Sequence, residues 1–498
     1  MLYRKIKVLF MSRSGHRLLP IVLLLNFVML MVLSTLYMSL WKTPTPKLGS
    51  KDYILTDIRK ILQEDKVRIP QYQYKILNMS VIGTKFAGVN KGRKMTDSID
   101  YCSALFKGDK DAMEKAHGHM NEFDHIFLRE DYFIKLANNC ARYKLVRRFV
   151  TVPLSKEEYE FPIAYSIIMY SDVQMVERLL RAIYMPQNFY CIHVDRKASS
   201  SVLQAMQSIV DCFPNVFIPP DRASVFWGHI SILEAEMICL KELVNYKWNY
   251  YINLSGQMFP LKTNAELVKI LKMYDGANDI EGTFERSRDF WLLIRQRVSW
   301  HIFEWANGWN VMLPSAFLKD TAPHHVKIYK GSNQAALSRE FALYLLHSRV
   351  AKDLMDWFSD TLAPDEYLWP TLNHNAHLRA PGGYLGDPET KAFTARVSIW
   401  LHAANQMNWS WDHWDCQGMW VRQICIFGIG DLPWLAKRPE LFANKFHSDF
   451  EYLAYDCMEE LHFNRTFTGV NPNFNLSYYQ HLPIVKNKHL VYHVEHHP

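Results

Sequence analysis

The chain has 498 residues, which is enough for one large globular domain or two ordinary ones with appendages. Hydrophobic residues make up 49% and charged residues 21%, with 20 Gly and 22 Pro, so disordered, collagen-like and low-complexity proteins are excluded. The net charge is +7, and most of it comes from five basic residues ahead of position 18: Arg4, Lys5, Lys7, Arg13 and Arg17. The rest of the chain is nearly neutral, which argues against a nucleic-acid-binding protein held by a broad basic face.

Residues 18–41 form an uncharged, mainly apolar stretch of 24 residues, and about 20 suffice to cross a bilayer. A cleaved signal peptide is the alternative, but its apolar region usually has only about 7–15 residues and ends at small residues, whereas this stretch ends at Tyr37-Met-Ser-Leu-Trp41. A buried core helix would not explain the basic flank. Because positive flanks stay cytoplasmic, we expect a single transmembrane signal-anchor of type II topology, with residues 1–17 as a cytoplasmic tail.

The region beyond the span is expected to comprise a stem and a folded domain. Thr43-Pro-Thr-Pro-Lys47 is typical of an extended linker, and the polar stretch to about residue 100 has no strong periodicity. We therefore expect a lumenal stem over residues 42–100 and a lumenal domain over residues 101–498. A homodimer formed through the stem is compatible with this organisation.

All eight cysteines lie beyond the span, as expected in an oxidising lumen, and their even number allows four disulfides. Their spacing fits no zinc site, and the sequence alone does not assign their partners. Asn-x-Ser/Thr sequons occur at five positions. Asn253 lies in an apolar run and is expected to be buried and unmodified, which leaves Asn78, Asn408, Asn464 and Asn475 as glycan acceptors.

From residue 161 onward, short apolar runs of strand length alternate with segments that have helical periodicity. We expect strands at residues 161–170, 188–194, 215–218 and 250–254, and helices at residues 173–184, 202–210, 229–244 and 264–274. This alternation predicts an α/β fold with a doubly wound, Rossmann-like sheet that binds its ligand at the carboxyl ends of its strands.

Phosphate-binding loops of the common types are missing, since no GxGxxG follows the first strand and no GxxxxGK[ST] occurs anywhere. The strand that ends at Val194 is followed by Asp195-Arg196-Lys197. The Asp195 carboxylate has two interpretations: it accepts hydrogen bonds from a nucleobase or ribose, or it caps a turn. The pattern alone leaves both open.

Four separate blocks of sequence carry a resemblance: residues 178–197, the run Pro364-Asp-Glu-Tyr-Leu-Trp369, residues 421–432, and Leu441-Phe-Ala-Asn-Lys445. They resemble core 2 β-1,6-N-acetylglucosaminyltransferases, which belong to the family-14 glycosyltransferases, and the resemblance extends over roughly residues 100–460. It implies a GT-A fold and a single-pass type II Golgi membrane enzyme. The implied reaction is inverting transfer of N-acetylglucosamine from UDP-GlcNAc to the 6-hydroxyl of GalNAc in Galβ1-3GalNAc-Ser/Thr, the core 2 branching step of mucin-type O-glycans.

The resemblance also implies that no metal or other cofactor is needed. Asp109-Lys-Asp111 is the only Asp-x-Asp spacing, and it lies in a charged segment upstream of the expected strands. Arg422 and Lys445 match the family positions whose positive charges take the place of a metal on the diphosphate. Glu366 matches the catalytic base, which takes the proton of the acceptor hydroxyl.

The remaining matches concern substrate contacts and disulfides. Donor-site positions are matched by Ile168, Met169, Tyr170, Asp195, Arg196, Lys197 and Trp227, the last standing where the family has a tyrosine. Acceptor-site positions are matched by Glu281 and Trp400, by His402 in place of a tyrosine, and by Arg286 or Arg288 in place of a lysine. The family's bridges correspond to Cys102–Cys457, Cys140–Cys212, Cys191–Cys239 and Cys416–Cys425.

The departures at Trp227 and His402 leave alternatives open. One is a transferase with another donor, UDP-glucose or UDP-xylose, or with a polylactosamine acceptor. The short stem argues against a xylosyltransferase, because those relatives carry long extra regions that this stem lacks. A second alternative is an inactive carbohydrate-binding membrane protein, against which the presence of Glu366, Arg422 and Lys445 argues.

Overall fold

A computed structural model describes residues 99–122, 127–285, 288, 290–304, 310–390, 392–401 and 414–488. The chain divides by its contacts into residues 1–84 and 85–498, and all the described residues belong to the second unit. Across these described ranges, no helix combines the length and the apolar character needed to span a bilayer. The predicted tail and span and the sequon at Asn78 lie outside the described residues and stay predictions, as do the domain boundaries.

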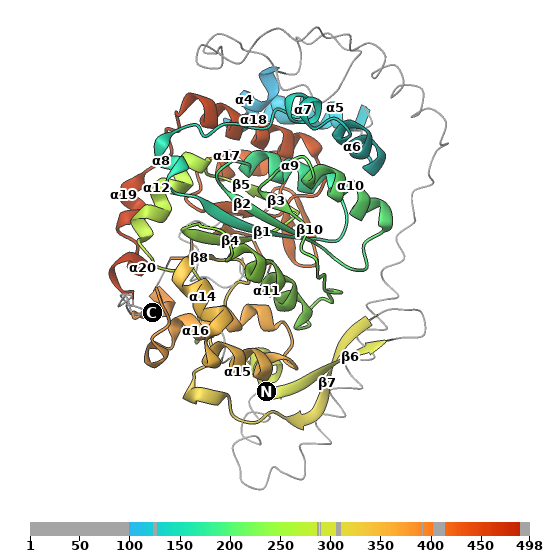
Figure 1. Cartoon of the computed structure of the whole chain (residues 1–498). Helices are drawn as coiled ribbons and strands as arrows, with labels where there is room; N and C mark the ends of the chain where they lie inside the picture. Colours follow the sequence, from blue (N-terminus) through green and yellow to red (C-terminus); the bar gives the residue numbers. More distant parts are fainter. Residues whose placement is uncertain are drawn as a thin grey trace, which may run out of the picture. The chain divides into compact units, whose positions relative to one another are not determined.

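The elements carry the labels of Figure 1 and follow one another from Ile99 onward. In the first half of the domain they are α4 (Ile99–Phe106), α5 (Lys110–Glu122), α6 (Glu130–Ala137), α7 (Cys140–Val146), α8 (Lys156–Tyr159), β1 (Ile163–Met169), α9 (Val173–Ile183), β2 (Phe189–Val194), α10 (Ser200–Val210), β3 (Val216–Phe217), α11 (Ser231–Leu243), β4 (Tyr250–Ser255), β5 (Met258–Pro260) and α12 (Asn264–Tyr274).

In the second half, helices and strands are shorter and several are single 3-10 turns, labelled η. They are α13 (Phe290–Arg297), β6 (Val298–Glu304), β7 (Asn310–Leu318), η4 (Pro323–His325), β8 (Ala336–Ser338), α14 (Arg339–His347), α15 (Arg349–Phe358), η5 (Pro364–Glu366), α16 (Leu368–His374), η6 (Ala376–Leu378), η7 (Pro388–Thr390), β9 (Arg396–Val397), β10 (Met419–Val421), β11 (Ile424–Ile426), η8 (Ile429–Asp431), α17 (Leu432–Leu435), β12 (Phe442–Asn444), α18 (Tyr452–Thr468), α19 (Leu476–Gln480) and α20 (Pro483–Lys486).

The central sheet has five strands in the order β3-β2-β1-β4-β8. Strands β1 to β4 run parallel, as the alternation of strands and helices predicts, and β8 adds an antiparallel edge that the sequence pattern did not predict. Helices α9 and α10 cover one face, and α11 and α14 cover the other (Figure 1). The predicted doubly wound α/β architecture is confirmed, with a sheet in which parallel strands dominate.

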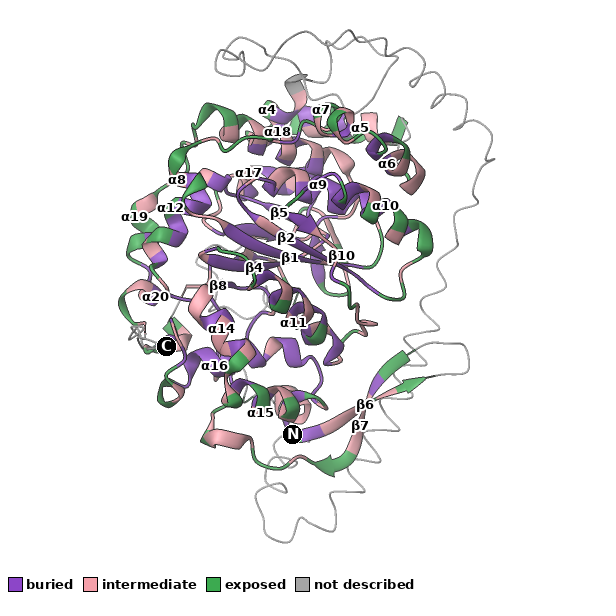
Figure 2. Ribbon diagram, viewed as in Figure 1, coloured by how far each residue is buried: buried purple, intermediate pink, exposed green. Residues whose placement is uncertain are grey.

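Burial on both faces explains why the central strands are almost continuously apolar. In β1, Ile163, Tyr165 and Ile167 contribute to the core beneath α9 and α10, while the intervening Ala164 contributes to the core beneath α11 and α14. Figure 2 shows the sheet as the most deeply buried layer of the described part. The strand alternation therefore divides one sheet between two hydrophobic cores.

A second sheet, in the order β5-β12-β9, packs in a third hydrophobic cluster together with α17 and α18. Two hairpins, β6-β7 and β10-β11, form separate two-stranded sheets. All four disulfides that the resemblance implies are present: Cys102–Cys457, Cys140–Cys212, Cys191–Cys239 and Cys416–Cys425. The first of them joins α4, at the start of the described domain, to α18 near its end.

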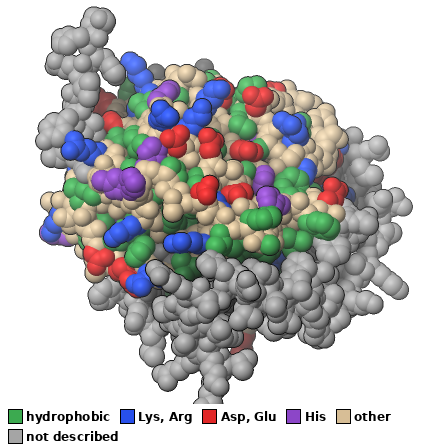
Figure 3. Space-filling view, turned by 90° about the horizontal axis from the view of Figure 1, so that it is seen from below, with side chains coloured by type: hydrophobic (Ala, Val, Ile, Leu, Met, Phe, Trp, Pro, Cys, Tyr) green, Lys and Arg blue, Asp and Glu red, His purple; other side chains and the backbone are tan. Residues whose placement is uncertain are grey.

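Two of the predicted glycan acceptors lie on the surface. Asn464 is exposed on α18, and Asn475 is exposed at the N-cap of α19, where its side chain accepts a hydrogen bond from the Ser477 N–H. Asn253 is buried, as expected, with only 2% of its surface exposed. Asn408 lies outside the described residues. On the face shown in Figure 3, acidic, basic and histidine side chains are interspersed.

Candidate active site

The predicted donor residues meet at the carboxyl ends of β1 and β2. These strands are neighbours in parallel register, with Ile168 opposite His193 and Met169 opposite Val194. The Asp195 N–H donates to the Met169 carbonyl over 2.8 Å, which fixes the two strand ends against each other. Ile168, Met169 and Tyr170 therefore lie beside Asp195, Arg196 and Lys197.

Asp195 caps its own turn, which is one of the two roles that the sequence left open. Its Oδ1 accepts from the Lys197 N–H over 2.8 Å and its Oδ2 from the Val225 N–H over 3.1 Å. The Lys197 ammonium lies 3.0 Å from Oδ2 and 4.4 Å from the centre of the Phe226 ring. The carboxylate thus ties the end of β2 to the loop that precedes α11.

That loop carries Trp227, whose side chain is 75% exposed. It is held to β2 at Ala223, whose N–H donates to His193 Nε2 over 2.8 Å. Burial lowers the pKa of His193 to about 4, so the ring stays neutral and keeps its acceptor nitrogen. A cavity of about 740 Å³ lies beside the loop; of the predicted donor residues, only Arg196 lines it.

Glu366, the predicted base, closes the short η5 turn. Its Oε2 lies 3.2 Å from Lys330 Nζ and 3.6 Å from Arg295 Nη1, and its side chain is 28% exposed. Among the described residues no group donates a hydrogen bond of good geometry to this oxygen. The Oε2 atom is itself buried, so a hydroxyl can approach this carboxylate only over the part of the side chain that is exposed.

The η5 turn is hydrogen-bonded to the donor side and to the acceptor side. The Ala363 N–H donates to the Gly228 carbonyl, next to Trp227, over 2.8 Å. On the other side, the Gly331 N–H donates to the Glu366 carbonyl over 2.8 Å. A Cβ at Gly331 would lie 2.1 Å from the Glu281 carbonyl oxygen, so only glycine allows these segments to approach.

Glu281, predicted to contact the acceptor, therefore lies beside the turn of Glu366. Arg396, at the start of β9, is half-buried among these acids, and its electrostatic partners are Glu281, Glu366 and Asp365. It also donates to Gln334 Oε1. The site thus contains a set of three cations, Arg295, Lys330 and Arg396, that face acidic side chains.

Arg422 and Lys445 lie close enough to interact. Lys445 follows β12 and is partly buried; burial and, secondarily, the charge of Arg422 lower the pKa of its ammonium. Arg422 is exposed in the turn between β10 and β11. Two like charges that approach each other in this way form a site for an anion such as a diphosphate.

The Lys445 segment is fastened to the end of β1. The Ser448 hydroxyl donates to Asp172 Oδ2 over 2.6 Å, and Asp172 caps α9 two residues after the predicted donor residue Tyr170. The Phe446 N–H donates to the Gln257 carbonyl over 2.9 Å, in the turn between β4 and β5. These contacts place the Lys445 backbone beside the strand ends that carry the predicted donor residues.

The other predicted acceptor residues divide into described and undescribed positions. Trp400 is 41% exposed and forms a β-bridge with Ile424, next to the turn that carries Arg422. Arg288 is exposed and lies 3.7 Å from Glu285 in an ion pair. Arg286 and His402 lie outside the described residues.

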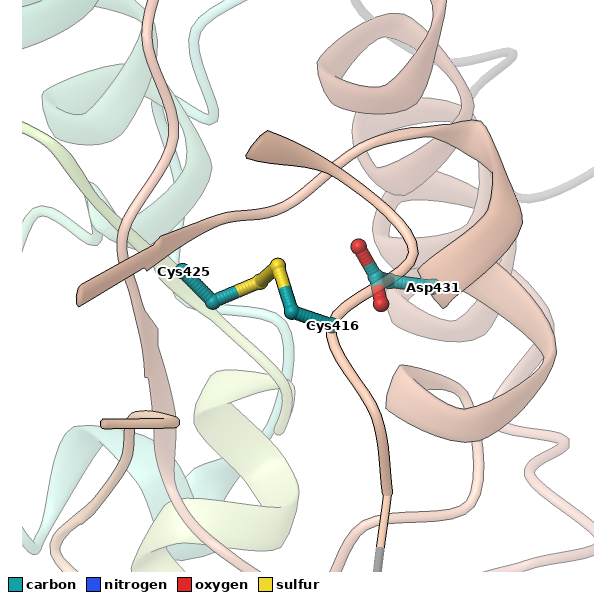
Figure 4. A group of neighbouring side chains, drawn as sticks. All are labelled: Cys416, Cys425 and Asp431. Carbon is teal, nitrogen blue, oxygen red and sulfur yellow. A yellow bond between two sulfur atoms is a disulfide. The ribbon is translucent and has the colours of Figure 1, made fainter. Parts of the chain in front are cut away.

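A group of potential metal ligands occurs elsewhere, at Cys416, Cys425 and Asp431, whose ligand atoms lie within 4.8 Å of one another. Figure 4 shows that the two cysteines form a disulfide, which removes their thiolates as ligands. Asp431 accepts from Trp414 Nε1 over 2.8 Å and from the N–H groups of Gln417 and Gly428. The group is therefore a structural junction.

Sequence reasoning missed three of the cations, Arg295, Lys330 and Arg396. They stand beyond residue 274, where the last predicted helix ends and where no regular alternation marks them. The position of Lys330 directly before Gly331 did not mark it as a site residue in the sequence. The close approach of Gly331 to Glu281 is visible only in three dimensions.

Comparison with known proteins adds the family context. A model of the family described as "Core-2/I-Branching enzyme" matches residues 163–436. Human "Beta-1,3-galactosyl-O-glycosyl-glycoprotein beta-1,6-N-acetylglucosaminyltransferase" is 37% identical over 339 residues, which cover 66% of this chain and 76% of the relative. Human "N-acetyllactosaminide beta-1,6-N-acetylglucosaminyl-transferase" is 38% identical over 341 residues, which cover 67% and 81%.

A rat relative, "Beta-1,3-galactosyl-O-glycosyl-glycoprotein beta-1,6-N-acetylglucosaminyltransferase 3", is 33% identical over 374 residues, which cover 72% of this chain and 82% of the relative. Among solved structures, the CMP:2-keto-3-deoxy-manno-octonic acid synthetase complexed with CTP covers 39% of this chain at 11% identity, with a TM-score of 0.20. A score this low carries no argument about the fold.

Proposed function

Since this chain belongs to the Core-2/I-branching enzyme family, we propose that it is a β-1,6-N-acetylglucosaminyltransferase of GT-A fold. The donor is UDP-GlcNAc, and the acceptor is the 6-hydroxyl of GalNAc in Galβ1-3GalNAc on Ser or Thr. The observation that supports this reaction best is the placement of the Glu366 side chain, ion-paired to Lys330 through Oε2 and partly exposed, in a turn hydrogen-bonded to the donor-side loop.

In the proposed reaction, Glu366 takes the proton of the acceptor hydroxyl as that oxygen attacks C1 of the sugar from the face opposite to UDP. The new C–O bond forms while the bond between C1 and the diphosphate oxygen breaks, so the configuration inverts. UDP leaves with additional negative charge. Arg422 and Lys445 stabilise this charge without a bound metal ion, which makes transfer independent of divalent cations.

Glu366→Gln tests the base, because the amide keeps the size of the side chain and removes its basicity. Transfer by the full-length protein in detergent and EDTA should be abolished, while UDP binding measured by calorimetry stays within about twofold of wild type. Glu340→Gln, on α14, is the matched control and should keep full activity. Substantial turnover by Glu366→Gln would contradict the assignment.

The acceptor has a second candidate, because a relative named for N-acetyllactosaminide is as similar to this chain as one named for O-glycosyl-glycoproteins. Polylactosamine is therefore tested beside Galβ1-3GalNAc-aryl, each with UDP-GlcNAc, UDP-glucose and UDP-xylose, and the linkage is read by NMR. A β-1,6-linked GlcNAc on Galβ1-3GalNAc supports the main proposal. Use of another donor would point to Trp227, which is exposed beside the donor residues.

We also propose a Golgi location, with residues 18–41 as a type II anchor and the domain in the lumen. The uncharged stretch with its basic flank and the four disulfides support this topology. Glycan attachment at Asn464 or Asn475 in intact cells, with protection of the domain from added protease in microsomes, is the expected result. Protease access to the domain would contradict it.

A further inference from the structure

Two buried carboxyl groups lie behind the proposed base, and the reaction described above uses neither. Asp365, directly before Glu366, is 7% exposed, and Glu236 on α11 is 3% exposed. Each has one oxygen, Asp365 Oδ1 and Glu236 Oε2, that is buried without a hydrogen-bond partner in the described part of the chain. An unpartnered buried carboxylate oxygen is costly, so this arrangement calls for an explanation.

The surroundings of Glu236 are rigid. Its Oε1 accepts from Asn253 Nδ2 over 2.8 Å, and Asn253 stands on β4, between β1 and β8 in the central sheet. Asn253 Nδ2 also donates to the Asn333 carbonyl, while Asn253 Oδ1 accepts from the Ala335 N–H. This network fixes one oxygen of Glu236 and leaves Oε2 free to interact with another group.

The backbone around Asp365 is equally constrained, since the η5 turn is held at Ala363 by Gly228 and at Glu366 by Gly331. The η5 turn and helix α11 are in contact, and the charge of Asp365 acts on Glu236 there. Two ionised carboxylates in this water-excluded contact would repel each other. A single proton on one of them would instead provide a donor to the unpartnered oxygen of the other.

The charged groups around the pair favour a retained proton. For Asp365, burial and the charge of Glu366 outweigh Lys330 and Arg396 and raise the pKa to about 7. For Glu236, burial and, to a smaller extent, Asp365 outweigh the hydrogen bond from Asn253 and raise the pKa to about 8. Tyr251 on β4 also faces Glu236, but its hydroxyl is hydrogen-bonded to Ser166 over 2.7 Å.

We propose that Asp365 and Glu236 hold one proton between them across their unpartnered oxygens. Asp365 is thereby a positioning residue: the shared proton keeps the turn that carries Glu366 against helix α11. Glu366, whose ion-pair partner is Lys330, remains the carboxylate that faces the acceptor. The kinetic consequence rests on the proposed transferase function, whereas the shared proton itself does not.

Loss of the proton should affect turnover on the alkaline side. Above pH of about 8, both carboxyls ionise and repel, the turn shifts, and the kcat measured at saturating UDP-sugar falls. Asp365→Asn and Glu236→Gln each replace the titrating proton by an amide N–H. Both variants should keep most of the wild-type kcat at pH 7 and should lose the fall above pH 8.

Asp365→Ala removes the donor and the acceptor together, and its kcat should fall about 100-fold with an unchanged KM for the donor. Glu242→Gln on the same helix is the matched control and should leave the pH profile as in wild type. Infrared spectroscopy supplies a readout independent of activity: wild type at pH 7 should show the C=O band of a protonated carboxyl, reduced in Asp365→Asn and in Glu236→Gln.

Three results would overturn the proposal. The first is an alkaline fall in kcat that persists in both amide variants. The second is a loss of activity in Asp365→Asn as complete as in Glu366→Gln, which would show that Asp365 must be ionised. The third is a carboxyl band that is absent at pH 7 in wild type, or that appears only when EDTA removes a bound cation. If no sugar is transferred at all, the infrared result still decides on the proton.

Discussion

At the scale of single residues, Lys445 is the group whose protonation reports most directly on donor binding. Burial and the nearby Arg422 lower the pKa of its ammonium in the absence of substrate. Both effects favour the neutral amine, and a diphosphate reverses the second one by placing negative charge between the two side chains. Binding of UDP and protonation of Lys445 are therefore coupled.

We predict that UDP binding takes up protons at alkaline pH, where part of the unliganded protein carries neutral Lys445. Calorimetry near pH 9 in two buffers of different ionisation enthalpy measures the uptake. Lys445→Met should abolish it and weaken UDP binding about 10- to 100-fold, which corresponds to the loss of one charge-assisted hydrogen bond. The exposed Lys437→Met is the matched control. An unchanged proton uptake in Lys445→Met would contradict the assignment of Lys445.

At the scale of elements, the β10-β11 hairpin holds Arg422 in a conformation that its own sequence does not favour. Arg422 and Gln423 form the turn with φ values of 49° and 69°. Two consecutive positive φ angles are typical of turns rich in Asn and Gly, and each costs about 1 kcal/mol or more in other residues. The disulfide between Cys416 and Cys425 holds this hairpin together and so helps to maintain the turn.

Removal of individual disulfides should separate stability from binding. In the chain-entropy model, the bridge with a sequence separation of 9 contributes roughly 2.5 kcal/mol and the bridge with a separation of 355 roughly 6 kcal/mol. Cys416→Ser with Cys425→Ser should weaken UDP binding more than it lowers Tm. Cys102→Ser with Cys457→Ser should lower Tm more and leave UDP affinity nearly unchanged. Equal effects of the two pairs on UDP affinity would contradict a specific role for the hairpin.

At the scale of the whole molecule, the parallel core could be predicted because its strands are buried on both faces and its helices follow a regular period. Strand β1 was expected at residues 161–170 and runs from Ile163 to Met169. Strand β8, with three residues, and β9, with two, are too short to produce a pattern. They pair with β4 and β12 because tertiary packing places them there, not because of their own propensity.

The residues of the candidate site likewise divide into those that a sequence pattern could predict and those that it could not. The residues after β2, Asp195, Arg196 and Lys197, were singled out by the rule that ligands bind at the carboxyl ends of parallel strands, whereas Ile168, Met169 and Tyr170 were found only by resemblance. Glu366, Arg422 and Lys445 were found only by resemblance, because no local pattern connects residues that stand on η5, in a hairpin turn and after a strand end. Lys330 and Arg396 were missed altogether, since their role depends on contacts with Glu366 and Glu281.

The stability of the domain should decrease both at acid pH and at alkaline pH, for different reasons. Glu459 on α18 binds Arg178 and Arg181 on α9 over 2.7 and 2.6 Å. Burial alone would raise the pKa of Glu459, but the two arginines outweigh it and lower the pKa to about 2. A group whose pKa is lowered by folding contributes stability above its ordinary value of 4.5, and this contribution is lost as the pH falls toward 2.

Asp365 and Glu236 act in the opposite direction, because folding raises their pKa values to about 7 and about 8. Their stabilising contribution is complete below pH of about 4 and is lost as the pH rises to about 8. The free energy of unfolding, measured by denaturant titration at each pH, should therefore fall as the pH approaches 2 and as it approaches 8, and should be greatest at intermediate pH. Glu459→Gln should cost about 3 kcal/mol at pH 6, because it leaves two arginines without their shared partner.

The same titrations distinguish the two limbs. Glu459→Gln should flatten the acid limb and leave the alkaline limb as in wild type, whereas Asp365→Asn should reduce only the alkaline limb, of which the part due to buried Glu236 remains. The two sites lie on different elements, Glu459 between α9 and α18 and Asp365 between η5 and α11, so their effects should add in the double variant. A double variant that departs from additivity would show that the ion cluster at α18 and the turn of Glu366 are mechanically connected.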